Sequence, residues 1–572
     1  MSANDMDTVE TGVLIVGGGP TGLTLANILG HGGVPFMLID LKPSTIGEPR
    51  AVSIDDESLR TMQAVGLSDP VMRDVVPGYG VHYLSRAGGS CFGKVEPTAS
   101  EYGFPRRNAF RQPLFEATLR RGIDRFSCGA ALFGRTLESF DQHDEGVSAV
   151  VSCTDGSRFT VKASFLVACD GGRSPVRETL GVKLVGSTFK ARWLVIDTAN
   201  DTDPFSQMRV YCDPRRPIVD VPGPYNTRRY EILIHPDESS EDALKEERIA
   251  QWLRPLRGDA PMNLIRKTVY TFHARVAERW QIGRIFLAGD AAHLTPPYAG
   301  QGMNSGVRDA HNLGWKLTAV LKGQLPSTIL SSYEEERRKH AQALIRLALN
   351  LGIVMAPGSR FSATAVQSFF RLTHRIPPVR DFFMQMKFKP KPRFDSGLLG
   401  PRERSGWGSP RGRMLPQPSV LARAGVDGAA ASSGGAPVES KLDDLIGHRF
   451  ALVQYESGPD NDFETLDHPL WDLLDVVRIR VLSPGSTLPA SPVSSKVVYV
   501  VDTSGVLPAW LGRHAKEVVV VRPDRYIAGT FAPGTEKTFA DTYASTLGVR
   551  PATVSASTRT KPAIAARSAS RM

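Results

Sequence analysis

Three glycines near the start of the chain have the spacing that brings a phosphate group close to the backbone. Gly17, Gly19 and Gly22 form the pattern G-x-G-x-x-G. The first glycine permits a tight turn, the second lets a pyrophosphate approach, and the third allows a helix to pack closely on a strand. Asp40 ends the next apolar run, where its carboxylate can accept hydrogen bonds from ribose hydroxyls. The pattern predicts dinucleotide binding, and by itself it does not separate FAD from NAD.

A second group of residues, between positions 284 and 316, has the types and order needed to hold a flavin. Asp290 follows an apolar run and a glycine, which places its carboxylate at the end of a strand. Pro296 and Pro297 stiffen the loop, and two further glycines permit close backbone approach before a helix that begins near Met303. The N-terminus of this helix would stabilise the negative charge of a reduced flavin ring.

These groups require an α/β framework to position them. A strand is predicted at 12–16, a helix at 23–29 and a second strand at 36–39, which together form a β-α-β unit. Alternating residues predict an antiparallel hairpin over 148–160, with its turn at Asp155-Gly156. The remaining predicted elements are a short buried strand at 165–168, a β-rich stretch over about 190–275, a strand at 285–288 and a long helix from Met303.

The last third of the chain divides by composition. Pro- and Gly-rich sequence predicts a linker over 391–438. A separate α/β unit is predicted over 439–551, and it contains no cysteine. The last residues, 552–572, are rich in Ser, Ala, Thr and Arg, and we predict a disordered basic tail.

Composition and charge limit the partners. The net charge is +10, which raises the question of a nucleic-acid partner, but part of the excess lies in the tail and the signs are interspersed elsewhere. We therefore expect no nucleic-acid partner, and a positive potential that steers an anionic substrate. The five cysteines are scattered singly without a C-x-x-C pair, so neither a zinc site nor a disulfide framework is expected.

Two observations predict a cytoplasmic protein that does not bind a membrane. The N-terminus is acidic and polar, without the basic and apolar regions of a signal peptide. The most apolar stretch, 343–357, contains Arg346 and Asn350, and we interpret it as a core helix because it is too short and too polar to span a bilayer.

Together with Asp170-Gly171 in FLVACDGGRSPVR, these motifs resemble those of the group A flavoprotein aromatic hydroxylases, which have the p-hydroxybenzoate hydroxylase fold. The resemblance covers about residues 10–390. It implies a Rossmann-like FAD-binding domain with an inserted β-rich substrate domain, followed by a C-terminal domain that resembles thioredoxin. The implied boundaries are 1–80, 105–185 and 275–350 for the FAD-binding domain, 81–104, 186–274 and 351–390 for the substrate domain, and 439–551 for the thioredoxin-like domain.

The resemblance also implies which residues hold FAD and lie near its ring. Asp170 and Gly171 match a motif that supports both FAD and nicotinamide binding, and Asp290 matches a residue that contacts the ribityl chain. Pro297 and Tyr298 would lie on the substrate side of the ring, whereas His293 is interpreted as orienting the loop. The implied cofactor-binding residues are Gly17, Gly19, Gly22, Asp40, Arg50, Arg111, Gln112, Asp170, Gly171, Asp290, Gly300, Gly302, Met303 and Asn304.

Within this family the chain is especially similar to the 3-(3-hydroxyphenyl)propionate hydroxylases, through segments such as PRAVSIDDESLRTMQAVGL, FPRRNAF and VRPDRYIAGT. The resemblance implies that NADH, or NADPH, reduces FAD and that O2 adds at flavin C4a. The hydroperoxide then hydroxylates a phenolic acid next to its hydroxyl and gives a catechol. No metal is implied, and a homodimer is left open. The PPYA sequence at 296–299 departs from some enzymes of this group, and this departure puts the exact substrate in doubt.

The residues that bind the substrate are less specified. A guanidinium can bind a carboxylate through two hydrogen bonds. Candidates for this role are Arg215, Arg216, Arg228 and Arg229. Candidates for a hydrogen bond to the phenol are His82, Tyr211, Tyr270, His273 and Tyr298.

Three other functions compete with this one. The first is a hydroxylase of another phenol, or of a polyketide-like aromatic, on the same fold. The second is a flavin-bearing regulatory or nucleic-acid-binding protein that uses the basic tail. The third is a plain NAD(P)-dependent dehydrogenase, which is disfavoured because there is no second G-x-G-x-x-G unit.

Overall fold

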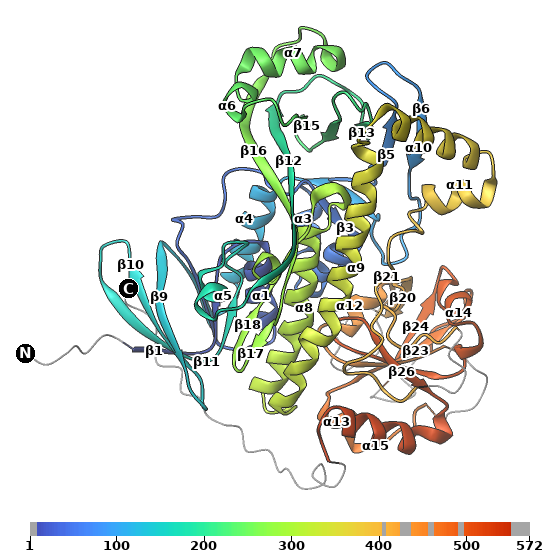
Figure 1. Cartoon of the computed structure of the whole chain (residues 1–572). Coiled ribbons are helices and arrows are strands. Elements are labelled where there is room, and N and C mark those ends of the chain that lie inside the picture. The colour runs from blue at the N-terminus through green and yellow to red at the C-terminus, as the bar shows by residue number, and fades with distance from the viewer. Residues whose placement is uncertain (1–7, 403–407, 424–435, 456–462, 490–496, 551–572) are drawn as a thin grey trace, which may run out of the picture.

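The computed structural model describes residues 8–402, 408–423, 436–455, 463–489 and 497–550, and Figure 1 shows how its parts are arranged. The predicted tail at 552–572 lies outside the described residues. Three large sheets organise the chain, with long helices between them. The helices used below are α1 (Pro20–His31), α2 (Asp56–Ala64), α4 (Gln112–Ile123), α7 (Glu246–Arg257), α8 (Gly302–Leu321), α9 (Ser332–Met355), α10 (Arg360–Thr373), α11 (Pro377–Met384), α13 (Pro469–Leu473) and α15 (Glu536–Thr546).

The first sheet carries the glycine turn. Its central strands β18-β11-β1-β2-β8 are all parallel, and β1 lies between β11 and β2. Both faces of such a sheet are covered, which explains the continuous apolar run at the end of β1. The strands of this sheet are β1 (Thr8–Val16), β2 (Phe36–Asp40), β8 (Gly129–Phe133), β9 (Arg135–Gln142), β10 (Val147–Cys153), β11 (Arg158–Ala168), β17 (Gln281–Ile282) and β18 (Ile285–Leu287).

One prediction about this sheet was wrong in detail. The second arm of the predicted hairpin and the predicted buried strand at 165–168 are one strand, β11, of 11 residues. On one side β11 pairs in parallel with β1 over residues 160–168. On the other side its first half pairs antiparallel with β10, and its end pairs in parallel with β18. The burial pattern changes from half-exposed to fully buried along the strand, which is why the sequence reads as two elements.

The second sheet is antiparallel for most of its extent and lies above the first in Figure 1. The two longest strands, β12 and β16, pair along their whole length and reach down towards the first sheet. Its order is β19-β16-β12-β15-β14-β13-β5-β6. The strands are β5 (Val81–Leu84), β6 (Cys91–Val95), β12 (Leu184–Ala199), β13 (Met208–Tyr211), β14 (Ile218–Pro222), β15 (Arg228–Ile234), β16 (Asn263–Ala277) and β19 (His293–Leu294).

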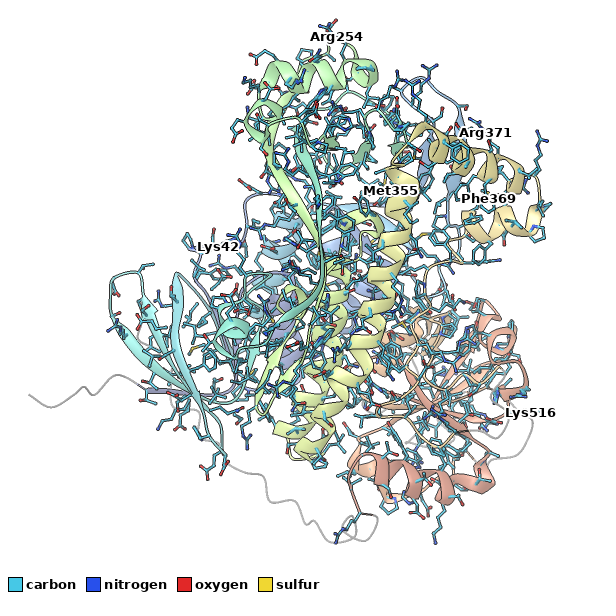
Figure 2. All side chains as sticks on the ribbon, in the orientation of Figure 1. Lys42, Arg254, Met355, Phe369, Arg371 and Lys516 are labelled. Carbon is cyan, nitrogen blue, oxygen red and sulfur yellow. The ribbon has the colours of Figure 1, made fainter. Side chains whose placement is uncertain are left out.

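Two long helices connect these layers. Helix α8 packs against α1 beside the first sheet, and α9 runs from there to the second sheet, where Met355 lies at its end (Figures 1 and 2). Helices α10 and α11 then pack on β6. No single helix in the described ranges has the length and hydropathy to cross a membrane; one bent pair, Ser327–Met355 with Arg360–Thr373, meets those criteria by length and composition alone.

The C-terminal unit is a third, mixed sheet with the order β21-β20-β24-β23-β22-β25-β26. Strands β22, β23 and β24 are parallel, whereas β25 and β26 run antiparallel, and α13 and α15 belong to the same unit. The strands are β20 (Ser419–Arg423), β21 (Pro437–Lys441), β22 (Ala451–Tyr455), β23 (Val477–Leu482), β24 (Val497–Asp502), β25 (Val518–Val521) and β26 (Ile527–Phe531).

The predicted linker at 391–438 requires a correction. Phe394, Leu399 and Met414 are buried in one cluster with Tyr526, and β20 is part of the third sheet. The Ala- and Gly-rich run at 429–436 falls almost wholly outside the described residues. The Pro and Gly content predicted a linker, although part of this segment is packed in the protein. Its apolar residues are spaced too irregularly to show the period of a helix or a strand.

Buried ion pairs join the C-terminal unit to the rest of the chain. Asp443 accepts from Arg60 at 2.6 Å and pairs with Arg525 at 2.9 Å. Glu336 on α9 pairs with Arg522 at 2.7 Å and Lys316 at 2.8 Å. Each of these two carboxylates has two cationic partners, which compensate for its burial.

Candidate active site

A cavity of about 480 Å³ opens where the parallel strands of the first sheet end. The predicted residues that line it are Gly17, Gly19, Asp40, Arg50, Gln112, Asp170, Gly171, Asp290, Pro297, Gly300, Gly302 and Met303. They come from parts of the sequence almost 290 residues apart, and one cavity brings them together. In open α/β sheets, ligands bind at the carboxyl ends of the strands, as this cavity does.

The glycine turn has the geometry expected for a pyrophosphate site. Gly17 has φ +111°, and a Cβ atom there would lie 2.3 Å from the carbonyl oxygen of Cys169. A Cβ on Gly22 would lie 2.0 Å from the carbonyl oxygen of Gly17, so this glycine serves packing and does not line the cavity. A Cβ on Gly19 would meet nothing within 4 Å. Gly19 therefore borders open space at the N-terminus of α1, where no side chain caps the helix.

Asp40 is held at the end of β2 beside this turn. Its Oδ2 accepts a hydrogen bond from the backbone N–H of Gly18 at 2.6 Å, and its Oδ1 accepts from Lys42 N–H at 2.8 Å. The carboxylate is thus oriented by the backbone and keeps acceptor capacity for ribose hydroxyls.

Several polar atoms at the site suit a large polar cofactor. In the described part of the chain, Oδ1 of Asp170 is buried at the cavity wall without a hydrogen-bond partner. Nε of the predicted residue Arg111 is also buried without a partner, but Arg111 does not line the cavity. Desolvation raises the pKa of Asp170, whereas Asp290 is exposed where it lines the cavity. Buried polar atoms without partners mark places where a ligand supplies the missing bond. With the open space at Gly19, these residues fit FAD. Gln112 lines the same cavity and accepts from the Ala51 N–H at 2.7 Å, which fixes the loop that carries Arg50.

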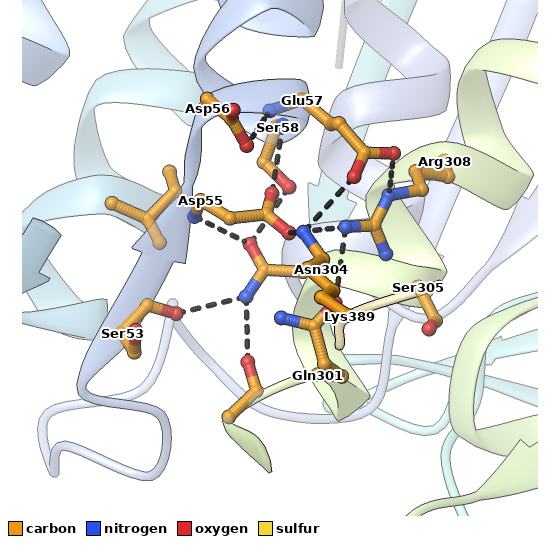
Figure 3. Close-up of polar contacts among 12 residues, drawn as sticks. Ser53, Asp55, Asp56, Glu57, Ser58, Gln301, Asn304, Ser305, Arg308 and Lys389 are labelled. Carbon is orange, nitrogen blue, oxygen red and sulfur yellow. Dashed lines mark hydrogen bonds and ion pairs between the residues drawn. The ribbon is translucent and has the colours of Figure 1, made fainter. Parts of the chain in front are cut away.

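The loop that would face the flavin ring ends in a left-handed turn at Gly300, with φ +62°. Helix α8 begins directly after it, and no side chain caps its N-terminus. Asn304 does not line the cavity. Its amide donates to the Gly300 carbonyl at 2.7 Å and to the Ser53 carbonyl at 3.0 Å, and its oxygen accepts from Ser58 Oγ at 2.7 Å (Figure 3). Asn304 therefore fixes the shape of the loop.

A buried charge network lies beneath this loop (Figure 3). Arg308 pairs with Asp55 and, at 2.7 Å, with Glu57, while Lys389 lies 3.0 Å from each of these carboxylates. The two cations balance the acidic residues at the start of α2, which makes the cluster an ion-pair network. Burial raises the pKa of the adjacent Asp56 to about 7.

His293 is fully buried behind the cavity wall. Its Nε2 lies 2.7 Å from Asp309, whose other oxygen accepts from Arg337 at 2.8 Å. Asp309 also accepts from the Gly289 N–H at 3.1 Å. Although burial opposes it, the positive field of His293 and Arg337 lowers the pKa of Asp309 to about 2. This geometry suits the interpretation of His293 as a residue that orients the Gly289-Asp290 loop.

Tyr298 lies in a second, smaller cavity on the other side of the loop. This cavity, of about 30 Å³, is also lined by Gln301, which lines the cofactor cavity as well. The Tyr298 ring packs edge-on against Trp193 and Phe272 at centroid distances of 5.9 and 5.7 Å. A third cavity, of about 60 Å³, shares Tyr83, Val95, Leu351 and Phe388 with the second one.

The four arginines predicted for the substrate carboxylate all have partners within the protein. Arg215 is exposed and pairs with Asp213 at 3.0 Å. Arg216 pairs with Glu238 at 2.6 Å, Arg228 with Asp220 at 2.6 Å, and Arg229 with Asp197 at 2.8 Å. Of the four, Arg229 alone lines the cofactor cavity. The structure therefore corrects the prediction that one of them is free to bind a substrate carboxylate.

The other predicted substrate residues lie in the second sheet, away from these cavities. His82 pairs with Glu96 at 2.6 Å, and Thr188 and His273 lie 3.0 Å apart. Tyr270 accepts from Arg266, and Tyr211 is buried in the core beside α7, where desolvation raises its pKa to about 12. The sequence interpretation placed the Gly300–Asn304 loop beside the flavin ring but gave no role to Gln301 within it. It also gave no role to Arg107, which stands inside the FPRRNAF segment.

Comparison with known proteins agrees with this site. Residues 10–348 match the family model described as FAD binding domain, and residues 412–546 match the HcaD C-terminal domain. The 3-(3-hydroxy-phenyl)propionate/3-hydroxycinnamic acid hydroxylase of Comamonas testosteroni is 38% identical over 93% of this chain and 96% of its own length. The enzyme of the same name from Escherichia coli K12 is 39% identical over 91% and 92%.

Solved structures give the same fold. The complex of aklavinone-11 hydroxylase with FAD and aklavinone is 25% identical, with a TM-score of 0.72 over 95% of this chain. The flavin-dependent monooxygenase PieE, solved with FAD and substrate, is 22% identical, with a TM-score of 0.76 over 96%. The predicted fold class is thereby confirmed. The chain belongs to the FAD-binding-domain family and, within it, to the FAD-dependent aromatic hydroxylases that include the 3-(3-hydroxyphenyl)propionate/3-hydroxycinnamic acid hydroxylases.

Proposed function

We propose that this enzyme hydroxylates 3-(3-hydroxyphenyl)propionate and 3-hydroxycinnamate next to the phenolic hydroxyl, with NADH and O2, to give the catechols. The observation that carries the proposal is identity of 38–40% over more than nine tenths of the chain to hydroxylases with these substrates in their names. The similarity extends well beyond the cofactor motifs, because it covers nearly the whole length of both chains.

Bound FAD would supply the redox chemistry, which is reduction by a nicotinamide and activation of O2. The residues of the chain would position the flavin ring and the substrate and would stabilise the charge that develops on the ring. The N-terminus of α8 has no side-chain cap, and its first residues, Gly302 and Met303, line the cofactor cavity, where the helix would stabilise negative charge on the ring. Tyr298, Trp193 and Phe272 form an aromatic wall on the other side of that loop, which excludes water from the reacting carbon.

The competing substrate class is a larger, polyketide-like phenol; a structural neighbour, aklavinone-11 hydroxylase, was solved with FAD and aklavinone. The identity to hydroxylases named for the two phenolic acids favours the smaller substrates. The choice of NADH over NADPH follows the resemblance. The five free cysteines suit the reducing cytoplasm in which we place the enzyme. A homodimer stays a prediction.

The test compares substrates on the FAD-loaded enzyme. Specificity constants are measured for 3-(3-hydroxyphenyl)propionate, 3-hydroxycinnamate, phenol and a fused-ring phenol, each with NADH and with NADPH. The proposal expects the two phenolic acids to have the highest kcat/KM and NADH to be preferred. A fused-ring phenol with a higher kcat/KM than either acid would establish the alternative.

A further inference from the structure

We propose that Arg107 binds the carboxylate of the substrate in the cavity beside Tyr298. The proposal rests on the proposed function, because it takes an aromatic acid as the ligand. It goes beyond that function by assigning the subsite and the residue that distinguish an acid from a neutral phenol.

The position of Arg107 relative to the flavin loop is the first argument. Arg107 is the first residue of β7 (Arg107–Phe110), which pairs with both β3 (Ser53–Asp55) and β4 (Val75–Pro77). Its side chain lines the same small cavity as Tyr298, Ala299 and Gln301. A ligand in this cavity would therefore have the flavin loop at one end and the guanidinium within reach.

The second argument is that Arg107 has no anionic partner in the described part of the chain. Its Nη2 donates to Tyr79 Oη at 3.0 Å, and its guanidinium lies 4.6 Å from the centroid of the Tyr79 ring. Nη2 also lies 3.5 Å from Met208 Sδ. No described oxygen accepts from Nε or Nη1, and no described carboxylate forms an ion pair with it. Tyr79 thus holds the Arg107 guanidinium in place, while Nε and Nη1 are free to donate hydrogen bonds to a ligand.

Among the described residues, two cations near Arg107 both have carboxylate partners, in contrast to Arg107. Lys389 lines the same cavity and pairs with Asp55 and Glu57. Arg106, the adjacent residue, pairs with Glu101 at 3.4 Å. A partly buried cation without a counter-charge is costly, and an aromatic carboxylate would remove that cost through charge-assisted, bidentate hydrogen bonds.

The lining also suits the rest of the ligand. Val81, Leu351 and three methionines, Met208, Met355 and Met386, provide an apolar wall. The volume of about 30 Å³ is smaller than a ligand pocket needs, so the methionine side chains must change rotamer to admit a ring. Methionine is the residue best able to do so, because its side chain is unbranched and flexible.

The test measures equilibrium binding to the FAD-loaded enzyme through the change in flavin absorbance. The ligands are 3-(3-hydroxyphenyl)propionate and its neutral counterpart 3-(3-hydroxyphenyl)propan-1-ol. Arg107→Met should raise the Kd of the acid roughly 10- to 100-fold and leave the Kd of the alcohol close to the wild-type value. Arg107→Lys, which keeps the charge without the fork, should give an intermediate Kd for the acid.

Arg215→Met is the matched control, because Arg215 is an exposed arginine of the second-sheet region paired with Asp213. It should change neither Kd. FAD content and thermal unfolding of each variant show whether the fold is kept, and Arg107→Lys serves as the test if Arg107→Met does not fold. Unchanged discrimination between acid and alcohol in both Arg107 variants would overturn the assignment. Failure of the wild-type enzyme to bind or turn over the acid would instead overturn the proposed function.

Discussion

The amide oxygen of Gln301 lies 3.1 Å from Nη2 of Arg308, in the loop between the cofactor cavity and the cavity beside Tyr298. A guanidinium can only donate, so this contact fixes which end of the Gln301 amide faces Arg308. The amide nitrogen must face away from Arg308, and no described oxygen accepts from it. Gln301 is therefore placed to donate a hydrogen bond to a ligand, such as a phenolate oxygen, beside the flavin loop.

Replacing Gln301 tests this orientation. Gln301→Leu should retain FAD and reduce kcat for hydroxylation roughly tenfold, the effect of one lost hydrogen bond to the reacting phenol, with a larger share of the consumed NADH appearing as hydrogen peroxide. Product and peroxide are assayed together. Gln251→Leu, on the exposed face of α7, is the control. If Gln301→Leu hydroxylates with wild-type efficiency, the amide has no role at the ring.

Two glycines of the G-x-G-x-x-G turn should respond differently to replacement by alanine: one variant should lose FAD affinity and the other should lose stability. Gly19→Ala should fold normally, because its Cβ meets nothing within 4 Å, but FAD binding should weaken at least roughly tenfold, because the methyl group occupies the space of the pyrophosphate. Gly22→Ala places its Cβ 2.0 Å from a backbone oxygen and should lower the stability of the apoprotein by about 1–3 kcal/mol. FAD titration and thermal unfolding separate the two. Identical behaviour of both variants would contradict the assigned roles.

Asp290 is predicted to hold the cofactor and not the fold. Asp290→Ala should lower FAD retention after gel filtration and raise its Kd roughly tenfold or more, since a charge-assisted hydrogen bond is lost, while the circular dichroism spectrum stays unchanged. Asp141→Ala, on the exposed strand β9, is the control. Full FAD occupancy in Asp290→Ala would show that its carboxylate does not contact the cofactor.

Asp56 should make stability depend on pH. Its pKa is raised by burial from 3.8 to about 7, so the unfolded chain loses this proton near pH 4 while the folded chain keeps it. The contribution of Asp56 to the free energy of unfolding is fully present below pH 4. It falls by about 1.4 kcal/mol for each pH unit above that, until the folded carboxyl ionises near pH 7. Asp56→Asn should reduce this fall and be more stable than wild type at pH 8, as measured by denaturant unfolding. If the free energies of unfolding of wild type and Asp56→Asn differed by the same amount at every pH from 4 to 8, the raised pKa of Asp56 would be contradicted.

The sequence anticipates which segments meet at the cofactor cavity because local spacing carries them, although Gly22, Arg111 and Asn304 do not line it. Gly17, Gly19 and Gly22 lie within one turn, and a strand end fixes Asp40, so no distant contact is needed to foresee their arrangement. The substrate side depends on contacts between distant segments. Asp213 occupies Arg215, whereas no carboxylate among the described residues pairs with Arg107, and the local sequence around either arginine does not show this difference.

The packing of the described part of the 391–418 segment was missed for a related reason. Its place is set by Tyr526 and by residues of α9 such as Glu336, which lie far away in the sequence. A composition rich in Pro and Gly describes the local chain and says nothing about such partners.

The central claim is that the enzyme couples NADH oxidation to hydroxylation of a phenolic acid. The most direct test measures NADH consumed, O2 consumed, catechol formed and peroxide formed in one reaction with 3-(3-hydroxyphenyl)propionate. We expect the acid to stimulate NADH oxidation strongly and to be converted to its catechol in amounts equal to the NADH consumed. NADH oxidation that yields peroxide and no catechol, or that the acid does not stimulate, would contradict the claim.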